Sequence, residues 1–155
     1  MKINWGLMIL FIILSNLVGS VGAIWSGGDS VWYQDLNKPD FNPPGWVFGP
    51  VWTLLFTLMG IALYFVWKSP ESNLRTVALI LFGVQFLFNV FWSFSFFGLE
   101  NPLLGLINIL ILDILILITG FYFFKVNIFS GYLLIPYFLW VLFATVLNWS
   151  LFRLN

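Results

Sequence analysis

Residues 46–67 read WVFGPVWTLLFTLMGIALYFVW, an apolar run of 22 residues with a tryptophan at each end. At 1.5 Å per residue, a helix of this length is about 33 Å long, which matches the roughly 30 Å hydrocarbon core of a bilayer. Tryptophan favours the headgroup level, because its ring is apolar while its N–H needs a polar partner. The run therefore predicts a helix that crosses a membrane.

Four further segments are long and apolar enough to cross a bilayer. They lie at about 5–25, 76–97, 102–124 and 129–152. The sequence therefore predicts an all-α fold, an integral membrane bundle of five transmembrane helices that forms a single domain over residues 1–155. An odd number of spans argues against two equal inverted halves of the transporter type.

The first apolar segment also resembles a secretory signal peptide, because Lys2 precedes the run. The run is longer than a usual signal-peptide core, and the polar residue Asn16 interrupts it. We therefore expect residues 5–25 to remain in the protein as a span.

The composition excludes several classes of function. The chain is 61% hydrophobic and 8% charged, with six basic and six acidic residues, whereas soluble domains are about a quarter charged. A nucleic-acid-binding protein needs a basic surface, so we expect no nucleic acid as a partner. The apolar composition instead predicts contact with membrane lipid. Because cysteine and histidine are both absent, disulfides, Cys/His zinc sites and His-dependent triads are excluded.

The basic residues predict the orientation of the bundle. With five spans, Lys2, Lys68, Arg75 and Lys125 share one side of the membrane, and the other side carries Lys38 and Arg153. Basic residues concentrate on the cytoplasmic side of bacterial membrane proteins. We therefore expect a bacterial cell membrane protein with a cytoplasmic N-terminus.

Aromatic, polar and small side chains at intervals of four form stripes on three of the spans. The stripes are Trp52 with Phe56; Gln85 with Asn89 and Ser93; and Trp140 with Ala144 and Asn148. Polar groups inside a bilayer either join helices by hydrogen bonds or mark a binding site. For any single amide the helix contact is the favoured reading, whereas the three stripes together favour a cavity on which they converge.

Two other features of the spans have a structural and a functional reading. Asp113 lies near the middle of its span without a basic residue at the same depth. A carboxyl group bonded to a neighbouring helix is favoured there over a proton relay. Ser15, Gly19 and Ala23 form a stripe of small residues. The stripe permits close helix packing, more readily within the chain than in a dimer.

Residues 38–52, KPDFNPPGWVFGPVW, contain four of the seven prolines of the chain. Proline fixes φ and lowers the entropy that is lost when a loop becomes ordered. The segment is therefore either a rigid connector or part of a lid over a binding site. We expect the lid loop at about residues 26–45.

Three blocks of sequence carry a resemblance to a known family. The first joins Trp32-Tyr33 to Pro43-Pro44-Gly-Trp46 and Gly49-Pro50-Val-Trp52, the second is Asn89-Val-Phe-Trp92-Ser93, and the third runs from Pro136 through Trp140 to Asn148. Together they resemble the TspO/MBR family, the tryptophan-rich sensory proteins and translocator proteins, also known as the peripheral benzodiazepine receptor family. The chain is similar to the bacterial type of member over nearly its whole length.

The resemblance implies a membrane receptor or sensor that binds porphyrins such as protoporphyrin IX, and similar planar hydrophobic ligands, in a pocket between the helices. It also implies that homodimers form. Matching positions predict a ligand-binding set of Tyr33, Pro43, Trp52, Asn89, Trp92, Ser93, Trp140 and Ala144. The porphyrin is expected as a ligand, with no resident cofactor and no metal site.

The resemblance leaves two alternatives to a receptor open, a transporter of tetrapyrroles and an enzyme that degrades protoporphyrin IX in light. Trp52 and Trp140 are the expected catalytic residues only if the degradation activity is present. Cholesterol binding is expected to be weak and non-saturable, because the segment from Leu147 to Arg153 lacks the tyrosine of the animal sterol motif.

Overall fold

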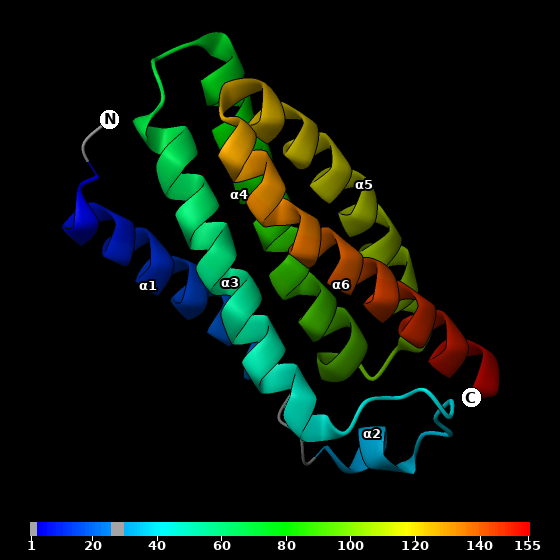
Figure 1. The fold of residues 1–155 in the computed structure, drawn as a ribbon. Helices are drawn as coiled ribbons and strands as arrows, with labels where there is room; N and C mark the ends of the chain where they lie inside the picture. Colours follow the sequence, from blue (N-terminus) through cyan, green and yellow to red (C-terminus); the bar gives the residue numbers. More distant parts are fainter. Residues whose placement is uncertain (1–2, 26–29) are drawn as a thin grey trace.

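The computed structural model describes residues 3–25 and 30–155. Within these ranges the chain is helical and contains no strand, with seven elements in order (Figure 1). They are α1 (Trp5–Ala23), α2 (Val31–Asp35), α3 (Gly45–Lys68), α4 (Asn73–Ser93), the π-helical turn η1 (Phe94–Gly98), α5 (Pro102–Val126) and α6 (Ile128–Leu154). Five of the helical segments are long and apolar enough to span a membrane, with α4 and η1 forming one of them. The predicted fold class is confirmed.

The ends of the long helices follow from local capping chemistry. Asn4, Ser72, Asn101 and Asn127 each accept a hydrogen bond from the backbone N–H three residues ahead, and so cap α1, α4, α5 and α6. Pro102 stands at the start of α5, where its missing N–H costs nothing. The cap at Ser72 starts α4 three residues before the expected position 76.

The segment before α3 contains a short helix that the sequence did not predict. Ser30 caps α2 by accepting from the N–H of Tyr33 at 3.3 Å. Of the expected lid loop at 26–45, residues 26–29 lie outside the described residues. The remainder is therefore a capped helix followed by a proline-rich connection to α3.

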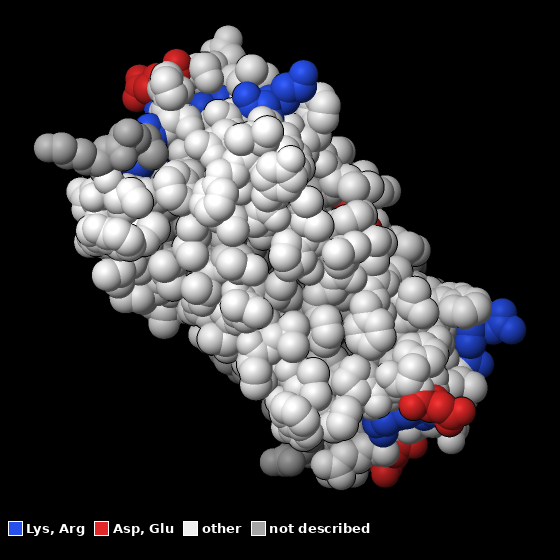
Figure 2. Space-filling view, viewed as in Figure 1, with Lys and Arg blue, Asp and Glu red and all other residues white. Residues whose placement is uncertain are grey.

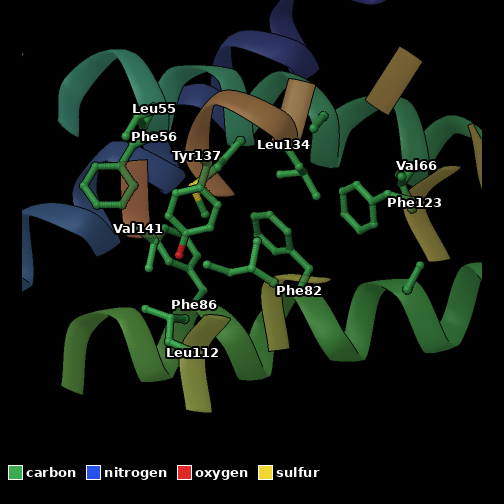
Figure 3. Close-up of a cluster of buried hydrophobic side chains, with 14 of the residues drawn as sticks. Leu55, Phe56, Val66, Phe82, Phe86, Leu112, Phe123, Leu134, Tyr137 and Val141 are labelled. Atoms are coloured by element: carbon green, nitrogen blue, oxygen red, sulfur yellow. The ribbon is translucent and has the colours of Figure 1, made fainter. Parts of the chain in front are cut away.

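A buried cluster of apolar side chains joins α3, α4, α5 and α6 (Figure 3). Phe82 of α4 stacks on Phe123 of α5 with ring centroids 5.7 Å apart, and Phe86 packs edge-on against Phe82 at 5.5 Å. Leu134 and Tyr137 of α6 lie in the same cluster. Aromatic rings thus fill the space between these helices.

The first helix packs against α3 through residues without bulk. A Cβ at Gly60 of α3 would lie 2.7 Å from the Cα of Ile12, and a Cβ at Gly19 would overlap the ring of Phe56. The close packing within the chain is confirmed. The buried residues of α1 are Ser15, Gly19 and Gly22, whereas Ala23 of the predicted stripe is exposed.

On the face shown in Figure 2, charged side chains gather at the two ends of the molecule, and the surface between them is almost free of charge. Lys68 is the last residue of α3, Arg75 lies in the first turn of α4 and Lys125 lies in the last turn of α5. These three mark the end opposite to the C-terminus (Figure 1). Lys2, the fourth basic residue expected there, lies outside the described residues.

Candidate functional site

A cavity of about 490 Å³ lies in the half of the bundle nearest α2. Its walls come from α1, α3, α4, η1 and α6, and Tyr33 of α2 contributes from the lid segment. Seven of the eight predicted site residues line it, namely Tyr33, Trp52, Asn89, Trp92, Ser93, Trp140 and Ala144. The volume falls within the roughly 300–1,000 Å³ typical of small-molecule pockets.

Pro43 is the predicted site residue that is not among those lining the cavity. Its carbonyl oxygen accepts from the side-chain amide of Asn42 at 3.1 Å, and the next residue, Pro44, is the N-cap of α3. Pro43 therefore shapes the entry of the chain into α3 rather than the wall of the cavity.

Aromatic residues are the largest group in the wall of the cavity. Eight rings line the cavity: Tyr33, Phe48, Trp52, Phe56, Trp92, Phe96, Phe97 and Trp140. Trp52 stacks on Phe56 with a centroid distance of 5.3 Å, and Trp92 stacks on Phe96 at 5.7 Å. Each stacked pair supports a ring from behind, so the flat faces keep a fixed position.

The stripe of α4 divides between the cavity and the core. Asn89 lines the cavity, and its amide nitrogen donates to the hydroxyl of Tyr137 at 3.1 Å. Tyr137 in turn donates to the side-chain oxygen of Gln85 at 2.9 Å. Gln85 is not among the lining residues, because this chain of hydrogen bonds holds it one turn deeper in the bundle.

The other stripes converge as expected. Trp52 and Phe56 of α3 line the same cavity as Trp140, Ala144 and Asn148 of α6. Asn148 is fully engaged, since its oxygen accepts from the indole N–H of Trp92 at 3.0 Å and its nitrogen donates to the carbonyl of Pro102 at 2.8 Å. All three amides thus bond to another helix, and two of them, Asn89 and Asn148, also line the cavity.

The lid segment is held by a ring contact to η1 and by a hydrogen bond within the segment. Trp32 packs edge-on against Phe96 at 5.3 Å. The hydroxyl of Tyr33 donates to the side-chain oxygen of Asn42 at 3.1 Å. Burial raises the pKa of Tyr33, and the hydrogen bond to Asn42 offsets only part of this rise. The hydroxyl therefore keeps its proton at neutral pH.

A pair of asparagines ties the lid to the last turn of α6. The backbone N–H of Asn37 donates to the side-chain oxygen of Asn155 at 2.9 Å, and the side-chain nitrogen of Asn155 donates back to the carbonyl of Asn37 at 3.1 Å. Residues 30–44, the described part of the connection between α1 and α3 that follows the gap, therefore contact α6 and η1 at the cavity end of the bundle.

Sequence reasoning missed two parts of the wall. The first is the face of α1, where Asn16, Gly19 and Ser20 line the cavity. The small-residue stripe of this span was a signal for close packing, and its extension to the cavity depends on where α1 crosses α3. The second is η1, whose Phe96 and Phe97 reach the cavity because the π-helical turn rotates them.

Asp113 lies apart from the cavity lining. Its Oδ2 atom accepts a hydrogen bond from the hydroxyl of Thr145 in α6 at 2.8 Å. The side chain thus bonds to a neighbouring helix, as the favoured reading expected.

The comparisons with known proteins agree with this architecture. The TspO/MBR family model matches residues 11–154. The chain is 43% identical to "Tryptophan-rich protein TspO" of Chlorobaculum tepidum over 143 residues, 89% of each chain. It is 33% identical to "Tryptophan-rich sensory protein" of Cereibacter sphaeroides, over 100% of this chain and 95% of the relative. It is also 33% identical to "Translocator protein" of Homo sapiens, over 94% and 88%. The chain is a multi-pass membrane protein that belongs to the TspO/MBR family.

Proposed function

We propose that the protein is a membrane receptor or sensor that binds porphyrins, such as protoporphyrin IX, and similar planar hydrophobic ligands in the cavity between the helices. Family membership supports a sensor or translocator role in the membrane. The observation that carries the ligand class is the ring of eight aromatic side chains around one cavity of about 490 Å³.

Aromatic walls suit a flat ligand. Offset-stacked and edge-on aromatic contacts are each worth about 0.5–1.5 kcal/mol beyond the burial of area. The described residues that line the cavity include no Lys, Arg, Asp or Glu. The apolar ring of a ligand therefore belongs inside, and charged substituents belong at the mouth. Lys38, whose ammonium lies 4.9 Å from the centroid of the Tyr33 ring, brings positive charge next to a lining residue.

The chain favours a metal-free ring over haem. It contains no histidine and no cysteine, so it has neither an imidazole nor a thiolate for an axial position. Stacking and polar contacts are then the means of holding the ligand.

A titration of the purified protein with protoporphyrin IX tests the proposal. Saturable quenching of tryptophan fluorescence in the dark is the expected result. A linear response that detergent or lipid alone reproduces would contradict it. The same samples, illuminated, test the enzyme alternative: release of many equivalents of altered porphyrin would show turnover. Flux of porphyrin in liposomes would show transport.

The positions of Trp52 and Trp140 keep the light-dependent activity as a second candidate. Both indoles line the cavity, so a bound porphyrin would lie beside both. If turnover occurs, Trp52→Phe and Trp140→Phe should lower its rate by more than they lower binding.

We further propose a bacterial cell membrane location with the N-terminus in the cytoplasm. Lys68, Arg75 and Lys125 at one end, against Lys38 and Arg153 at the other, support it. In intact cells, a cysteine at Ser72 should be shielded from an impermeant thiol reagent. A cysteine at Asn37 should react. The reverse pattern would overturn the orientation.

A further inference from the structure

Trp92 combines a hydrogen bond of its indole N–H with a stacked ring contact. Its indole N–H donates to Asn148 at 3.0 Å, and its ring stacks on Phe96 at a centroid distance of 5.7 Å. By contrast, the indole nitrogen of Trp140 is buried without a hydrogen-bond partner among the described residues. Trp92 therefore offers the cavity a ring face while its N–H is already used.

A second amide acts on the backbone of the same residue. Asn108 of α5 is only 4% exposed. With its amide oriented so that both ends are bonded, its nitrogen donates to the carbonyl of Phe88 at 3.1 Å and its oxygen accepts from the N–H of Trp92 at 3.3 Å. An α-helix pairs these two backbone groups with each other, and α4 is α-helical through Ser93. Asn108 thus bonds to both partners of one turn of α4.

Gly105 makes this reach feasible. A Cβ at Gly105 would lie 2.9 Å from the ring of Phe96 and 3.0 Å from the side-chain oxygen of Asn148. Any larger residue would therefore push α5 away from η1 and α6. Because Asn108 follows less than one turn later, the absence of a side chain at Gly105 lets a short amide reach the backbone of α4.

We propose that Asn108 is a positioning residue for the Trp92 wall of the cavity. Asn108 fixes the backbone of Trp92, and Asn148 fixes its indole. The wall then presents a ring face and no free donor, so it selects ligands that stack rather than ligands that bring an acceptor group to it. This consequence for ligands rests on the proposed binding function, whereas the positioning itself does not.

A purely structural role makes a different prediction. When Asn108 becomes alanine, the carbonyl of Phe88 and the N–H of Trp92 can bond to each other, so no backbone group loses its partner. The change should therefore move Trp92 far more than it unfolds the protein. A residue that only holds α4 against α5 would instead lower stability and leave the indole where it is.

The indole N–H signals of the nine tryptophans, recorded by ¹⁵N NMR on the ligand-free protein in detergent, test the positioning. Trp92→Phe assigns the signal of Trp92. Asn148→Leu should shift that signal most, and Asn108→Ala should shift it clearly while signals outside the Trp92 surroundings stay in place. Thr119→Val is the control on α5, because the hydroxyl of Thr119 bonds to its own helix at Leu115. A Trp92 signal that is the same in Asn108→Ala and in the parent would overturn the proposal.

Protoporphyrin IX affinity supplies the second readout. Asn108→Ala should weaken binding several-fold in the parent and have almost no effect in the Trp92→Phe background, since the residue acts through Trp92. Equal losses in both backgrounds would refute the coupling. If the alanine variant does not fold, Asn108→Ser keeps a small polar group and faces the same criteria. If the variants show the expected NMR shifts but the parent protein shows no saturable binding of protoporphyrin IX, the proposed function is refuted and the positioning role of Asn108 stands.

Discussion

Aromatic side chains are common in both halves of the bundle, but they form a packed core in one half and the wall of a cavity in the other. Toward Lys68 and Lys125, aromatic rings pack on one another, as in the stacked pair Phe82 and Phe123 at 5.7 Å (Figure 3). Toward α2, rings of similar size surround a cavity of about 490 Å³. An aromatic-rich membrane bundle therefore does not enclose a cavity by composition alone.

What differs is how each ring is held. In the closed half, rings from α4 and α5 meet across the helix interface and fill it. In the cavity half, rings stack on neighbours within their own segment, as Trp52 does on Phe56, and amides such as Asn148 tie the indoles to the wall. The small residues of α1 cover one side without filling the space. The cavity therefore stays open because stacking contacts and hydrogen bonds hold these side chains at its wall.

The largest effects are expected when volume is added to each half, because the cavity half should lose ligand affinity and the closed half should lose stability. Ala144 lines the cavity, whereas Ala78 is fully buried in the closed half. Ala144→Leu should lower protoporphyrin IX affinity at least about tenfold, a loss of about 1.4 kcal/mol, with little loss of stability. Ala78→Leu should instead lower the free energy of unfolding by about 1–3 kcal/mol through overpacking. Thermal unfolding and quenching titrations on both variants decide the matter, and equal effects at the two sites would show that the halves do not differ.

Removing part of one stacking surface should give the next largest effect. Trp140→Phe should weaken protoporphyrin IX binding by up to about tenfold and remove part of the quenching, because one stacking contact is worth about 0.5–1.5 kcal/mol. Trp67→Phe is the matched control, since Trp67 packs on Phe11 at the other end of α3. If both variants bind like the parent, the wall is placed wrongly.

Loosening the lid should change the rate of ligand release more than the fold. Pro44 occupies the N-cap position of α3, and Pro43 precedes it. Replacing both prolines by glycine should speed ligand release a few-fold. Each proline stabilises the ordered segment by about 0.4–1 kcal/mol, because it lowers the conformational entropy of the disordered chain. Stopped-flow release measures the effect. Pro70→Gly in the α3–α4 connection should leave the rate unchanged, and a similar rate in all three proteins would make residues 38–52 a connector only.

Charge at the mouth should contribute less. Lys38→Gln should weaken protoporphyrin IX binding by less than about fivefold, because an exposed ion pair is worth about 0.2–1 kcal/mol. The dimethyl ester of the same porphyrin, which lacks the two charges, should bind both proteins alike. A loss that is equal for acid and ester would remove Lys38 from the account of specificity.

The smallest effect is expected at Asp113. Asparagine keeps the volume and the oxygen that accepts from Thr145. Asp113 is also absent from the cavity lining. Asp113→Asn should therefore retain thermal stability and affinity. A large loss of either would show that the acidic group itself is required.

The fold was predictable because its signals are local. Apolar length defines each span, and tryptophans mark the ends of two of them. The cap at Ser72 was missed, so α4 begins three residues earlier than expected. The site was predictable in part, because Asn89, Trp52 and Trp140 lie on stripes with helical spacing. The wall formed by α1 and η1 was not, because it depends on a crossing point and on a π-helical turn that no spacing rule reveals. The same holds for Asn108, whose partners lie on a different helix.

A structure of the protein with bound protoporphyrin IX would test the proposed binding site. We expect the porphyrin ring inside the cavity, between Trp52 and Trp140, with the ring face of Trp92 toward it and the indole N–H of Trp92 still bonded to Asn148. A ring on the lipid-facing surface, or one that leaves the cavity empty, would contradict it.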